Sequence, residues 1–573
     1  MVRKKMPLLV LFCFCFSVVS LFAQIDLTVD RVEITQVIQD RNLAADQDNI
    51  IRLVGFKNTV ARVYVGFTGS ADPVPNVTAL IHVYQDDVEV DGSPVLPDGP
   101  ITAPVPPASR TRVDPRSSSE NQTINFTLPP LMGGNVRIDA TVNPDRTIVE
   151  TDYDNNSLTV DGLVFECRRI PDLVYQPINY RPTADYPNPN LPDVDMIAPG
   201  VGDAFVRGIY PIYDLNYRLA PGTPLEWNQD INRSSGSFQT QMAIRRRMMD
   251  PMPDFMYSWF PGNPFGGNGQ ASPSGMVAFG NTDAARWQRT FAHEIGHLFG
   301  RGHNSRRLDQ VGFYTEDQLG LGRVKGTNLY DIMAAGRLTN QAWIDIQTYN
   351  AFLDRPILFC PSGGGPNKTA VTDMGNYLFM TGTLYPDGTA RLNPAYTLNG
   401  RTDYTMPSED PTHWLIIQDG AGAELYRLPF DARPAEYDGD IENPSTVESS
   451  FSLAVPAFDN IGRLIIEKDG EVLDVMERRA DAPTIAWDSP ANFIMGKDKI
   501  VWSADAAPGM LTYSVQYSPD NGFTWYPLAI DLKESILAID GAELGKTDRG
   551  IIRVLATDGL NTTVLERNGL NIF

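Results

Sequence analysis

One eleven-residue segment, His293-Glu-Ile-Gly-His-Leu-Phe-Gly-Arg-Gly-His303, constrains the fold of this chain more than any other feature. On an α-helix, residues i and i+4 lie on one face, so His293 and His297 can direct their imidazoles at one cation. Gly300 can take the left-handed conformation that ends a helix and turns the chain back, which lets His303 approach the same point. Three imidazole ligands leave a fourth coordination position for water, which is typical of catalytic zinc. The sequence therefore predicts a helix, a glycine turn and a Zn²⁺ site.

Glu294 is the residue in this segment that can act on water. It lies about 100 degrees around the helix from His293, so it can hold a water beside the metal without ligating the metal. The alternative is a helix with solvent-facing histidines. Three of the chain's 5 histidines lie in the segment, which favours the metal site. The other two, His82 and His413, lie in β-rich stretches and are expected to be ordinary surface or turn residues.

The segment fits H-E-x-x-H-x-x-G-x-x-H at every fixed position and resembles the fingerprint of the metzincin clan of zinc endopeptidases. That clan also has a methionine turn downstream, and the run Asp331-Ile-Met-Ala-Ala-Gly336 places Met333 there. The resemblance implies an α+β catalytic domain over residues 166–361. It implies hydrolysis of protein or peptide substrates, with Zn²⁺ as cofactor and Glu294 as general base.

The resemblance also implies where a substrate would bind. The strand before the active-site helix would be an edge on which an extended peptide pairs, and its residues would be Gly275, Met276, Val277, Ala278 and Phe279.

Two positions depart from particular branches of the clan. Asn304 stands where the snake-venom-like branch has Asp, and Ala335 stands where astacin-like members have a tyrosine. We therefore assign no branch and no tyrosine ligand, although Tyr330 is nearby.

Residues 1–23 combine a basic start, Arg3, Lys4 and Lys5, with an uncharged apolar run that ends in the small residues Ser20 and Ala23. This pattern is typical of a secretory signal peptide; as a membrane anchor the run would only match the shortest bilayer spans. We expect a bacterial protein that is secreted or displayed at the cell surface, with no transmembrane segment in the mature chain.

The cysteines support an extracytoplasmic location. Cys13 and Cys15 lie in the signal segment, which leaves Cys167 and Cys360. In an oxidising compartment such a pair is most simply a disulfide, and this one would bracket the predicted catalytic domain. The alternative is two buried free thiols.

The remainder of the chain shows the short alternating runs and turn signals of all-β sandwiches, over residues 24–165, 362–482 and 483–573. The run Ile148-Val-Glu-Thr-Asp-Tyr-Asp-Asn-Asn156 resembles the closing hairpin of CARDB immunoglobulin-like domains; any other seven-strand sandwich is the alternative. The expected architecture is thus multidomain, an α+β metzincin-like domain flanked by all-β immunoglobulin-like sandwich domains. These β domains are candidates for binding cell-surface or extracellular-matrix partners.

Within residues 166–361 the periodicity predicts strands over 173–180, 254–260 and 275–279 and helices over 238–249 and 283–299. Thr339 is expected to cap a last helix that runs through residue 352, and residues 361–366 to form a linker.

The chain's charge excludes one class of partner. Its 47 basic and 70 acidic residues give a net charge of -23, which repels nucleic acid and anionic membranes.

A second motif opens a different class of function. Ser518-Pro-Asp-Asn-Gly-Phe-Thr-Trp525 fits the Asp-box of sialidases and other β-propellers. Propellers repeat the Asp-box in each blade, whereas this chain has one copy, so we interpret it as a structural hairpin. The alternative function is a cell-surface adhesion or carbohydrate-binding protein in which the protease-like domain is secondary.

Overall fold

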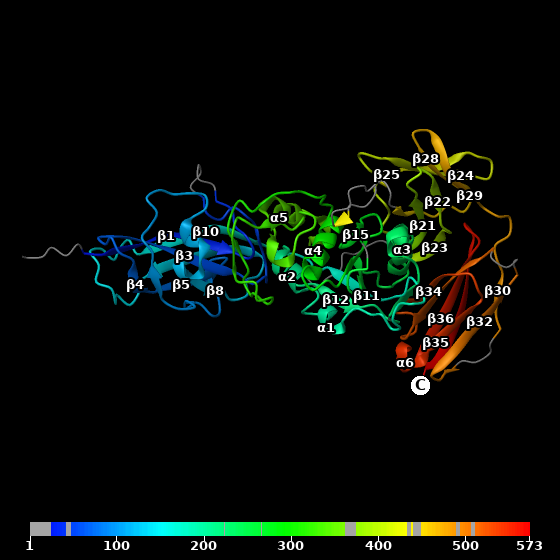
Figure 1. Cartoon of the computed structure of the whole chain (residues 1–573), viewed down its shortest axis with the longest axis horizontal. Coiled ribbons are helices and arrows are strands. Elements are labelled where there is room, and N and C mark those ends of the chain that lie inside the picture. The colour runs from blue at the N-terminus through cyan, green and yellow to red at the C-terminus, as the bar shows by residue number, and fades with distance from the viewer. Residues whose placement is uncertain are drawn as a thin grey trace, which may run out of the picture.

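The computed structural model describes residues 24–41, 47–222, 224–264, 266–360, 374–432, 437–438, 448–488, 493–505 and 510–572. The predicted signal segment and the predicted linker over 361–366 lie outside these residues. The molecule is elongated, with an N-terminal β unit at one end, a central unit with helices, and two further β units at the other end (Figure 1). The described residues are thus β-rich on both sides of the central unit, as predicted.

The N-terminal unit is a β-sandwich. One sheet has the order β1-β3-β8 and the other β2-β10-β9-β5-β6, and their inner faces share one core that includes Val63, Phe126 and Ile138. Alternate residues of β9 are buried, as a strand with one face on a core requires. The strands are β1 (Asp26–Thr35), β2 (Leu53–Val54), β3 (Val60–Thr68), β5 (Ala79–Gln85), β6 (Val88–Glu89), β8 (Ile124–Thr127), β9 (Gly134–Val142) and β10 (Ser157–Glu166), with a side pair of β4 (Val74–Val77) and β7 (Ile101–Ala103).

The central unit is built on a mixed sheet with the order β12-β11-β14-β16-β15-β26. The parallel members are β11 (Asp172–Tyr180), β12 (Asn216–Leu219), β14 (Phe255–Phe260) and β16 (Val277–Asn281), and β13 (Leu225–Trp227) also pairs with β11. Strand β15 (Gly269–Ser272) runs antiparallel to β16. On its far side β15 pairs antiparallel with β26 (Tyr437–Asp438), which therefore runs in the same direction as β16. The last strand comes from a part of the sequence far beyond the other five.

Helices cover both faces of this sheet. Side chains alternate along β14, so Tyr257 and Trp259 join a core with α4 (Trp287–Leu298), whereas Met256 and Phe260 join a core with α3 (Ile231–Arg247). The shorter helices are α1 (Val194–Ile197), α2 (Ala204–Ile209) and α5 (Ile346–Leu353). Small strand pairs are β17 (Gly312–Phe313) with β18 (Val324–Lys325) and β19 (Tyr330–Asp331) with β20 (Ala342–Trp343).

Two sequence-based expectations for the central unit are wrong. The predicted substrate edge over Gly275 to Phe279 is not an edge, because β16 pairs with β14 on one side and with β15 on the other. The last helix does not begin at Thr339, which lies in a 3-10 turn. Its cap is Asp345, whose carboxylate accepts from the Thr348 amide at 2.7 Å.

The C-terminal part contains two β units. The first pairs β21 (Met374–Leu384) with β22 (Ala390–Leu392), β23 (Tyr396–Arg401) and β27 (Ser449–Pro456), facing a sheet of β24 (His413–Asp419), β25 (Glu424–Phe430), β28 (Ile461–Lys468) and β29 (Glu471–Glu477). The second contains α6 (Gly541–Leu544) and two sheets, β31-β37-β36-β33-β34 and β30-β32-β35. Their strands are β30 (Ile485–Trp487), β31 (Phe493–Ile494), β32 (Lys497–Ala504), β33 (Thr512–Ser518), β34 (Tyr526–Leu532), β35 (Ile536–Asp540), β36 (Thr547–Thr557) and β37 (Thr562–Ile572).

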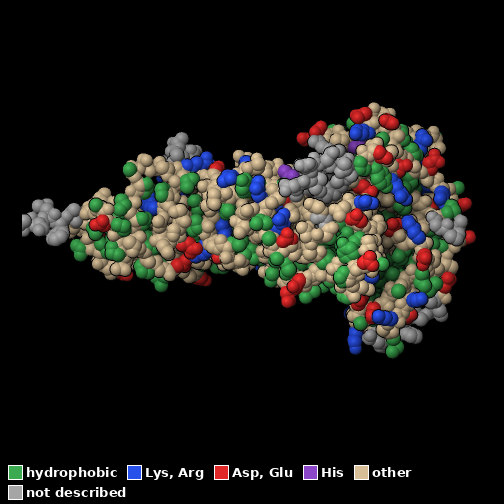
Figure 2. Space-filling view, in the orientation of Figure 1, with side chains coloured by type: hydrophobic (Ala, Val, Ile, Leu, Met, Phe, Trp, Pro, Cys, Tyr) green, Lys and Arg blue, Asp and Glu red, His purple; other side chains and the backbone are tan. Residues whose placement is uncertain are grey.

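A disulfide joins Cys167 and Cys360, whose Cα atoms are 5.9 Å apart, so it ties the first and last segments of the central unit together. Acidic and basic side chains are intermingled over the face seen in Figure 2. Within the part of the chain that the structure describes, none of the helices has both the length and the apolar character needed to cross a bilayer.

Candidate metal and catalytic site

Helix α4 ends in the glycine turn that the sequence predicts. Gly300 has φ +78°, its amide donates to the His297 carbonyl at 2.8 Å, and the Arg301 amide donates to the Gly296 carbonyl at 3.1 Å. These two bonds form a Schellman motif, which closes the helix and reverses the chain. As a result His303 comes back beneath the helix to the two histidines that the helix carries.

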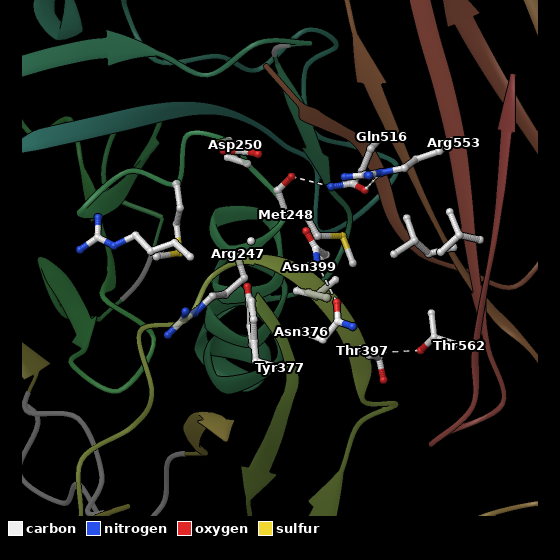
Figure 3. Close-up of a pocket in the computed structure, with 17 residues that line it drawn as sticks. Arg247, Met248, Asp250, Asn376, Tyr377, Thr397, Asn399, Gln516, Arg553 and Thr562 are labelled. Carbon is white, nitrogen blue, oxygen red and sulfur yellow. Dashed lines mark hydrogen bonds between the residues drawn. The ribbon is translucent and has the colours of Figure 1, made fainter. Parts of the chain in front are cut away.

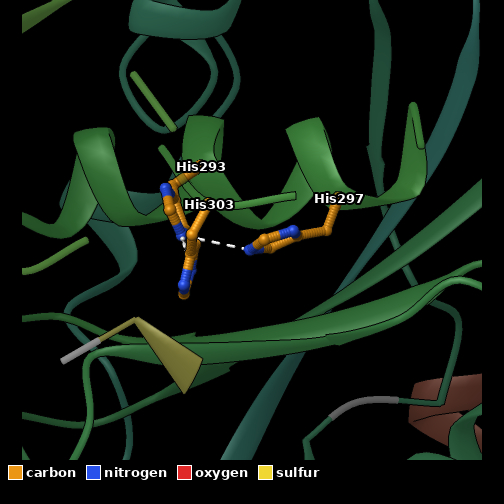
Figure 4. Close-up of side chains that lie close together, drawn as sticks. All are labelled: His293, His297 and His303. Carbon is orange, nitrogen blue, oxygen red and sulfur yellow. Dashed lines mark hydrogen bonds between the residues drawn. The ribbon is translucent and has the colours of Figure 1, made fainter. Parts of the chain in front are cut away.

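The three imidazoles converge on one point (Figure 4). His293 Nε2 is 2.9 Å from His303 Nε2 and 3.1 Å from His297 Nε2. The other ring nitrogens contact the backbone, with His293 Nδ1 2.8 Å from the Ile332 carbonyl and His297 Nδ1 2.7 Å from the Arg301 carbonyl. The Arg301 carbonyl only accepts, so His297 Nδ1 donates to it and leaves His297 Nε2 with a lone pair. His293 Nδ1 also lies 3.0 Å from the Arg289 guanidinium, which only donates.

This donor set fits a metal ion. Ligand nitrogens of His293, His297 and His303 all lie within 4.8 Å of one another, and a divalent cation would bind all three at once. Burial, together with the nearby Arg289 guanidinium, lowers the pKa of His293 well below its ordinary value, which keeps this imidazole in the neutral form that a metal requires. The structure thus brings His293, His297 and His303 together as a metal-ligand set.

Glu294 is fully buried on the same helix and faces strand β15. A Cβ added to Gly269 would lie 2.6 Å from Glu294 Oε1, so only a glycine leaves room for this carboxylate beside the strand. Glu294 therefore lies between the histidine helix and β15.

Met333 lies under the histidine helix. It is fully buried, and a Cβ on Gly296 would collide with its sulfur, so the helix and the methionine are packed as closely as a glycine allows. The turn is tied to the third histidine through Asn304, whose amide donates to the Met333 carbonyl at 3.1 Å and whose side chain donates to Asp331 at 2.5 Å. Asn304 thus has a structural role in this turn.

Two functional candidates were missed by the sequence analysis, Arg289 and Asp438. Both side chains are fully buried, and they form an ion pair next to His293. Asp438 Oδ1 is 4.0 Å from His293 Nε2 and accepts from the Gly336 amide at 2.7 Å. Burial raises the pKa of Asp438, but the Arg289 and His293 side chains outweigh that effect and hold it well below its usual range.

A signal for Arg289 was present in the sequence. It lies four residues before His293, on the same face of the helix, and a charge on the buried face of a helix requires a partner. Asp438 carried no comparable signal, because it lies in a different unit of the chain.

A separate cavity of about 290 Å³ lies between α3 and the two C-terminal units (Figure 3). Its lining includes Met248, Tyr377, Gln516 and Arg553 and contains no histidine. Gln516 donates to the Met248 carbonyl at 2.6 Å and accepts from Arg553 at 2.6 Å. These contacts join the units. Of this cavity and the histidine site, the histidine site is the one with groups suited to hydrolysis.

The Asp-box has the contacts of a hairpin device. The Gly522 amide donates to the Ser518 hydroxyl at 2.7 Å, and the Thr524 amide donates to Asp520 at 2.8 Å. Trp525 exchanges backbone hydrogen bonds with Asp250 of the central unit, at 2.7 and 3.1 Å. The motif therefore shapes a turn and docks it on the central unit.

Comparisons with known proteins assign no family. No known family model matches the chain, and no curated protein is similar to it. Among solved structures, a CARDB domain from Pyrococcus furiosus, in complex with di-metal ions, is 22% identical over 25% of this chain and 90% of its own, with a TM-score of 0.15. A Parabacteroides merdae β-glucuronidase is 9% identical over 94% of this chain and 77% of its own, with a TM-score of 0.13. A tetra-tandem repeat of a large adhesion protein is 11% identical over 95% and 98%, with a TM-score of 0.11. At TM-scores this low, none of the alignments indicates an activity.

Proposed function

We propose that the protein is a secreted, zinc-dependent endopeptidase of metzincin type. One observation carries this proposal: three histidines direct their Nε2 atoms to one point, with Glu294 buried on the same helix beside strand β15. Three nitrogen ligands with an adjacent carboxylate are the parts that metal-assisted hydrolysis of an amide needs.

The chain's own residues have distinct tasks in this proposal. Bound Zn²⁺ would act as a Lewis acid toward the scissile carbonyl and toward water. The Ile332 and Arg301 carbonyls orient the first two imidazoles toward the metal position. Glu294 takes a proton from the attacking water and delivers it to the leaving amine, and β15 holds the substrate backbone extended beside it.

The flanking units fit the same proposal. Secretion follows from the apolar N-terminal segment, and an N-terminal CARDB-like sandwich with two accessory β units would hold large substrates or cell-surface partners near the central unit. In this view the adhesive surfaces serve retention, and the hydrolytic site is the main activity.

The test of the proposed function begins with the metal. The purified chain should bind about one Zn²⁺, and His303→Ala should lose it because two imidazoles remain. His82→Ala is the matched control: His82 lies in the N-terminal unit, half-exposed and 2.7 Å from Glu89, and its loss should leave the metal content unchanged. Metal content is measured by mass spectrometry of the dialysed protein.

The second half of the test concerns turnover. Glu294→Ala should keep the metal and lose roughly 10²-fold or more of the peptide-cleavage rate, because it removes the proton carrier and no ligand. A peptide library should be digested by the wild-type chain and left intact after chelation. Full cleavage by the Glu294→Ala chain would overturn the mechanism.

A further inference from the structure

Strand β26 belongs by sequence to the first accessory unit, in the connection from β25 to β27, yet it pairs with the central sheet. Gly269 is opposite Asp438 and Gln270 opposite Tyr437 in an antiparallel register, and the Asn268 amide donates to the Asp438 carbonyl at 2.5 Å. In Figure 4 the short yellow arrow of β26 lies below the imidazoles. An extended segment that adds to the open side of a sheet is the geometry of strand addition by a peptide.

The side chain of Asp438 enters a prepared subsite. Its carboxylate is fully buried, pairs with Arg289, accepts from the Gly336 amide at 2.7 Å and is 3.4 Å from the Thr290 hydroxyl. The subsite therefore consists of a guanidinium, a backbone amide and a hydroxyl, all of which are donors toward an anion.

Arg289 makes this subsite selective. Its guanidinium is fully buried and also donates to the Ile332 and Ala334 carbonyls, so it cannot turn out toward water when Asp438 leaves. A buried cation without a counter-ion is strongly unfavourable, so a second carboxylate must replace the first. An uncharged side chain in the same register would leave the guanidinium unpaired.

We propose that residues 437–438 occupy the substrate position on β15, and that Arg289 and the Gly336 amide form a subsite for an acidic substrate side chain, which Asp438 fills in the resting chain. The proposal rests on the proposed endopeptidase function and adds to it a substrate class and an internal competitor. The preferred substrate is an extended peptide with Asp in the register of Asp438, and such a peptide must displace β26.

The first test compares the full chain with its Asp438→Ala variant on two fluorogenic peptide libraries that differ only in Asp or Asn at one position. Asp438→Ala should raise cleavage of the Asp library at least about tenfold, because the competitor loses its anchor. It should also cleave the Asp library at least about tenfold faster than the Asn library. Glu471→Ala, an exposed acidic residue on β29 of the same unit, is the matched control and should leave both rates unchanged. Equal or lower rates in the Asp438→Ala chain would overturn the proposal.

The second test needs no turnover. A labelled peptide with the sequence of residues 433–441, and the same peptide with Asn in place of the aspartate at 438, are titrated against the full-length Asp438→Ala chain by fluorescence anisotropy. The Asp peptide should bind at least about tenfold more tightly. Hydrogen exchange of the Asn268 amide should be faster in this variant than in the wild type, because its acceptor lies on β26.

The combined outcomes separate the two proposals. Absence of peptide binding, or unchanged exchange at Asn268, overturns the internal competitor whatever the peptidase activity is. Selective binding of the Asp peptide with faster exchange supports the subsite, and if neither chain then cleaves any library peptide, the endopeptidase function is what fails. Arg289→Met should abolish the Asp over Asn preference in binding. Since Arg289 is buried, folding of the Arg289→Met variant is checked by circular dichroism. If that variant does not fold, the binding and cleavage results of the Asp438→Ala chain decide whether the subsite exists.

Discussion

Gly296 shows how a single residue determines the distance between two parts of the site. It is the second of the two variable positions between Glu294 and His297, and it faces the sulfur of Met333 with no room for a methyl group. Because His293 and His297 lie on either side of it on the helix, any separation of α4 from the methionine turn also moves the ligands. The close packing of Met333 thus fixes the position of the helix that carries His293 and His297.

We predict that Gly296→Ala destabilises the chain by about 1–3 kcal/mol, the usual range for overpacking a core. It should also weaken zinc binding, since the helix must move. In a Met333→Ala background the same change should cost much less, because the colliding sulfur is gone. Urea unfolding and metal titration of the four chains measure both effects, with Gly99→Ala as control, since Gly99 has open space around it. A Gly296→Ala cost that is the same in both backgrounds would contradict the contact.

Local chemistry explains which site residues the sequence could predict. The ligands, Glu294 and the Gly300 turn lie within three helical turns of one another, so their spacing alone places them. Asp438 lies in a different unit, and its approach to Arg289 depends on how two units dock, which no local spacing encodes. The metal ligands were therefore predictable from the sequence, whereas Asp438 next to them was not.

At the scale of the element, the order of strands was harder to predict than their existence. The runs 173–180 and 254–260 were predicted as strands and appear as β11 and β14. Each contains a run of apolar residues that is long enough to indicate a strand. The four residues of β15 include Gly269 and polar side chains and contain no β-branched or aromatic residue, so no strand was predicted there. That missing strand is why β16 was predicted to be the edge.

The Asp-box hairpin gives a prediction at this scale. Asp520→Ala removes the acceptor of the Thr524 amide and should destabilise the last β unit by about 1 kcal/mol, while peptide cleavage stays unchanged. Burial raises the pKa of Asp520, but hydrogen bonds from Thr524, Ser518 and the Phe523 amide together outweigh it and lower the pKa. The stabilisation should therefore be present above about pH 4 and be lost as pH falls through the lowered pKa. Thermal unfolding of both chains between pH 2 and 7 tests this. Loss of cleavage in the folded Asp520→Ala chain would show that the motif does more than shape a turn.

At the scale of the whole molecule, Lys57 links the N-terminal and central units. Its ammonium group is buried and donates to the Arg207 and Ile212 carbonyls at 2.7 and 3.1 Å. Burial lowers the pKa of Lys57 from 10.5 to about 7. Between these two values the unfolded chain holds a proton that the folded chain has lost. The free energy of unfolding therefore rises as pH increases from about 7 to 10.5, and this gain in stability is lost as pH falls toward 7.

We predict that this rise approaches about 1.4 kcal/mol per pH unit between pH 8 and 10, the value for one proton. Lys57→Met should remove that slope, whereas Lys468→Met, which changes an exposed lysine on β28, should retain it. Calorimetry of the three chains across this pH range measures the difference. A wild-type slope equal to that of Lys57→Met would show that Lys57 keeps its ordinary pKa in the folded chain.

The way the units pack also bears on the domain limits, which remain a prediction. A catalytic unit that ends at residue 361 would lose the cover of α3, because Phe238 and Met242 share one buried cluster with Tyr377, Phe379 and Ala454 of the accessory unit. Exposing such a cluster costs apolar burial of about 25 cal/mol per Å². The central unit thus shares a buried core with the accessory unit. Its removal from that unit should lower its stability as well as change its contacts with large substrates.

We therefore predict that a chain ending at residue 361 melts at a lower temperature than the full chain and binds a hydrophobic dye, because α3 presents an apolar face that nothing covers. Replacing Phe238 and Met242 by polar residues should abolish the dye binding of the shortened chain. In the full chain the same replacements should be strongly destabilising, since the positions are buried there. Calorimetry and dye fluorescence of the four chains distinguish the two situations. A shortened chain that melts like the full chain and binds no dye would show that the central unit folds independently and that residue 361 is a true domain boundary.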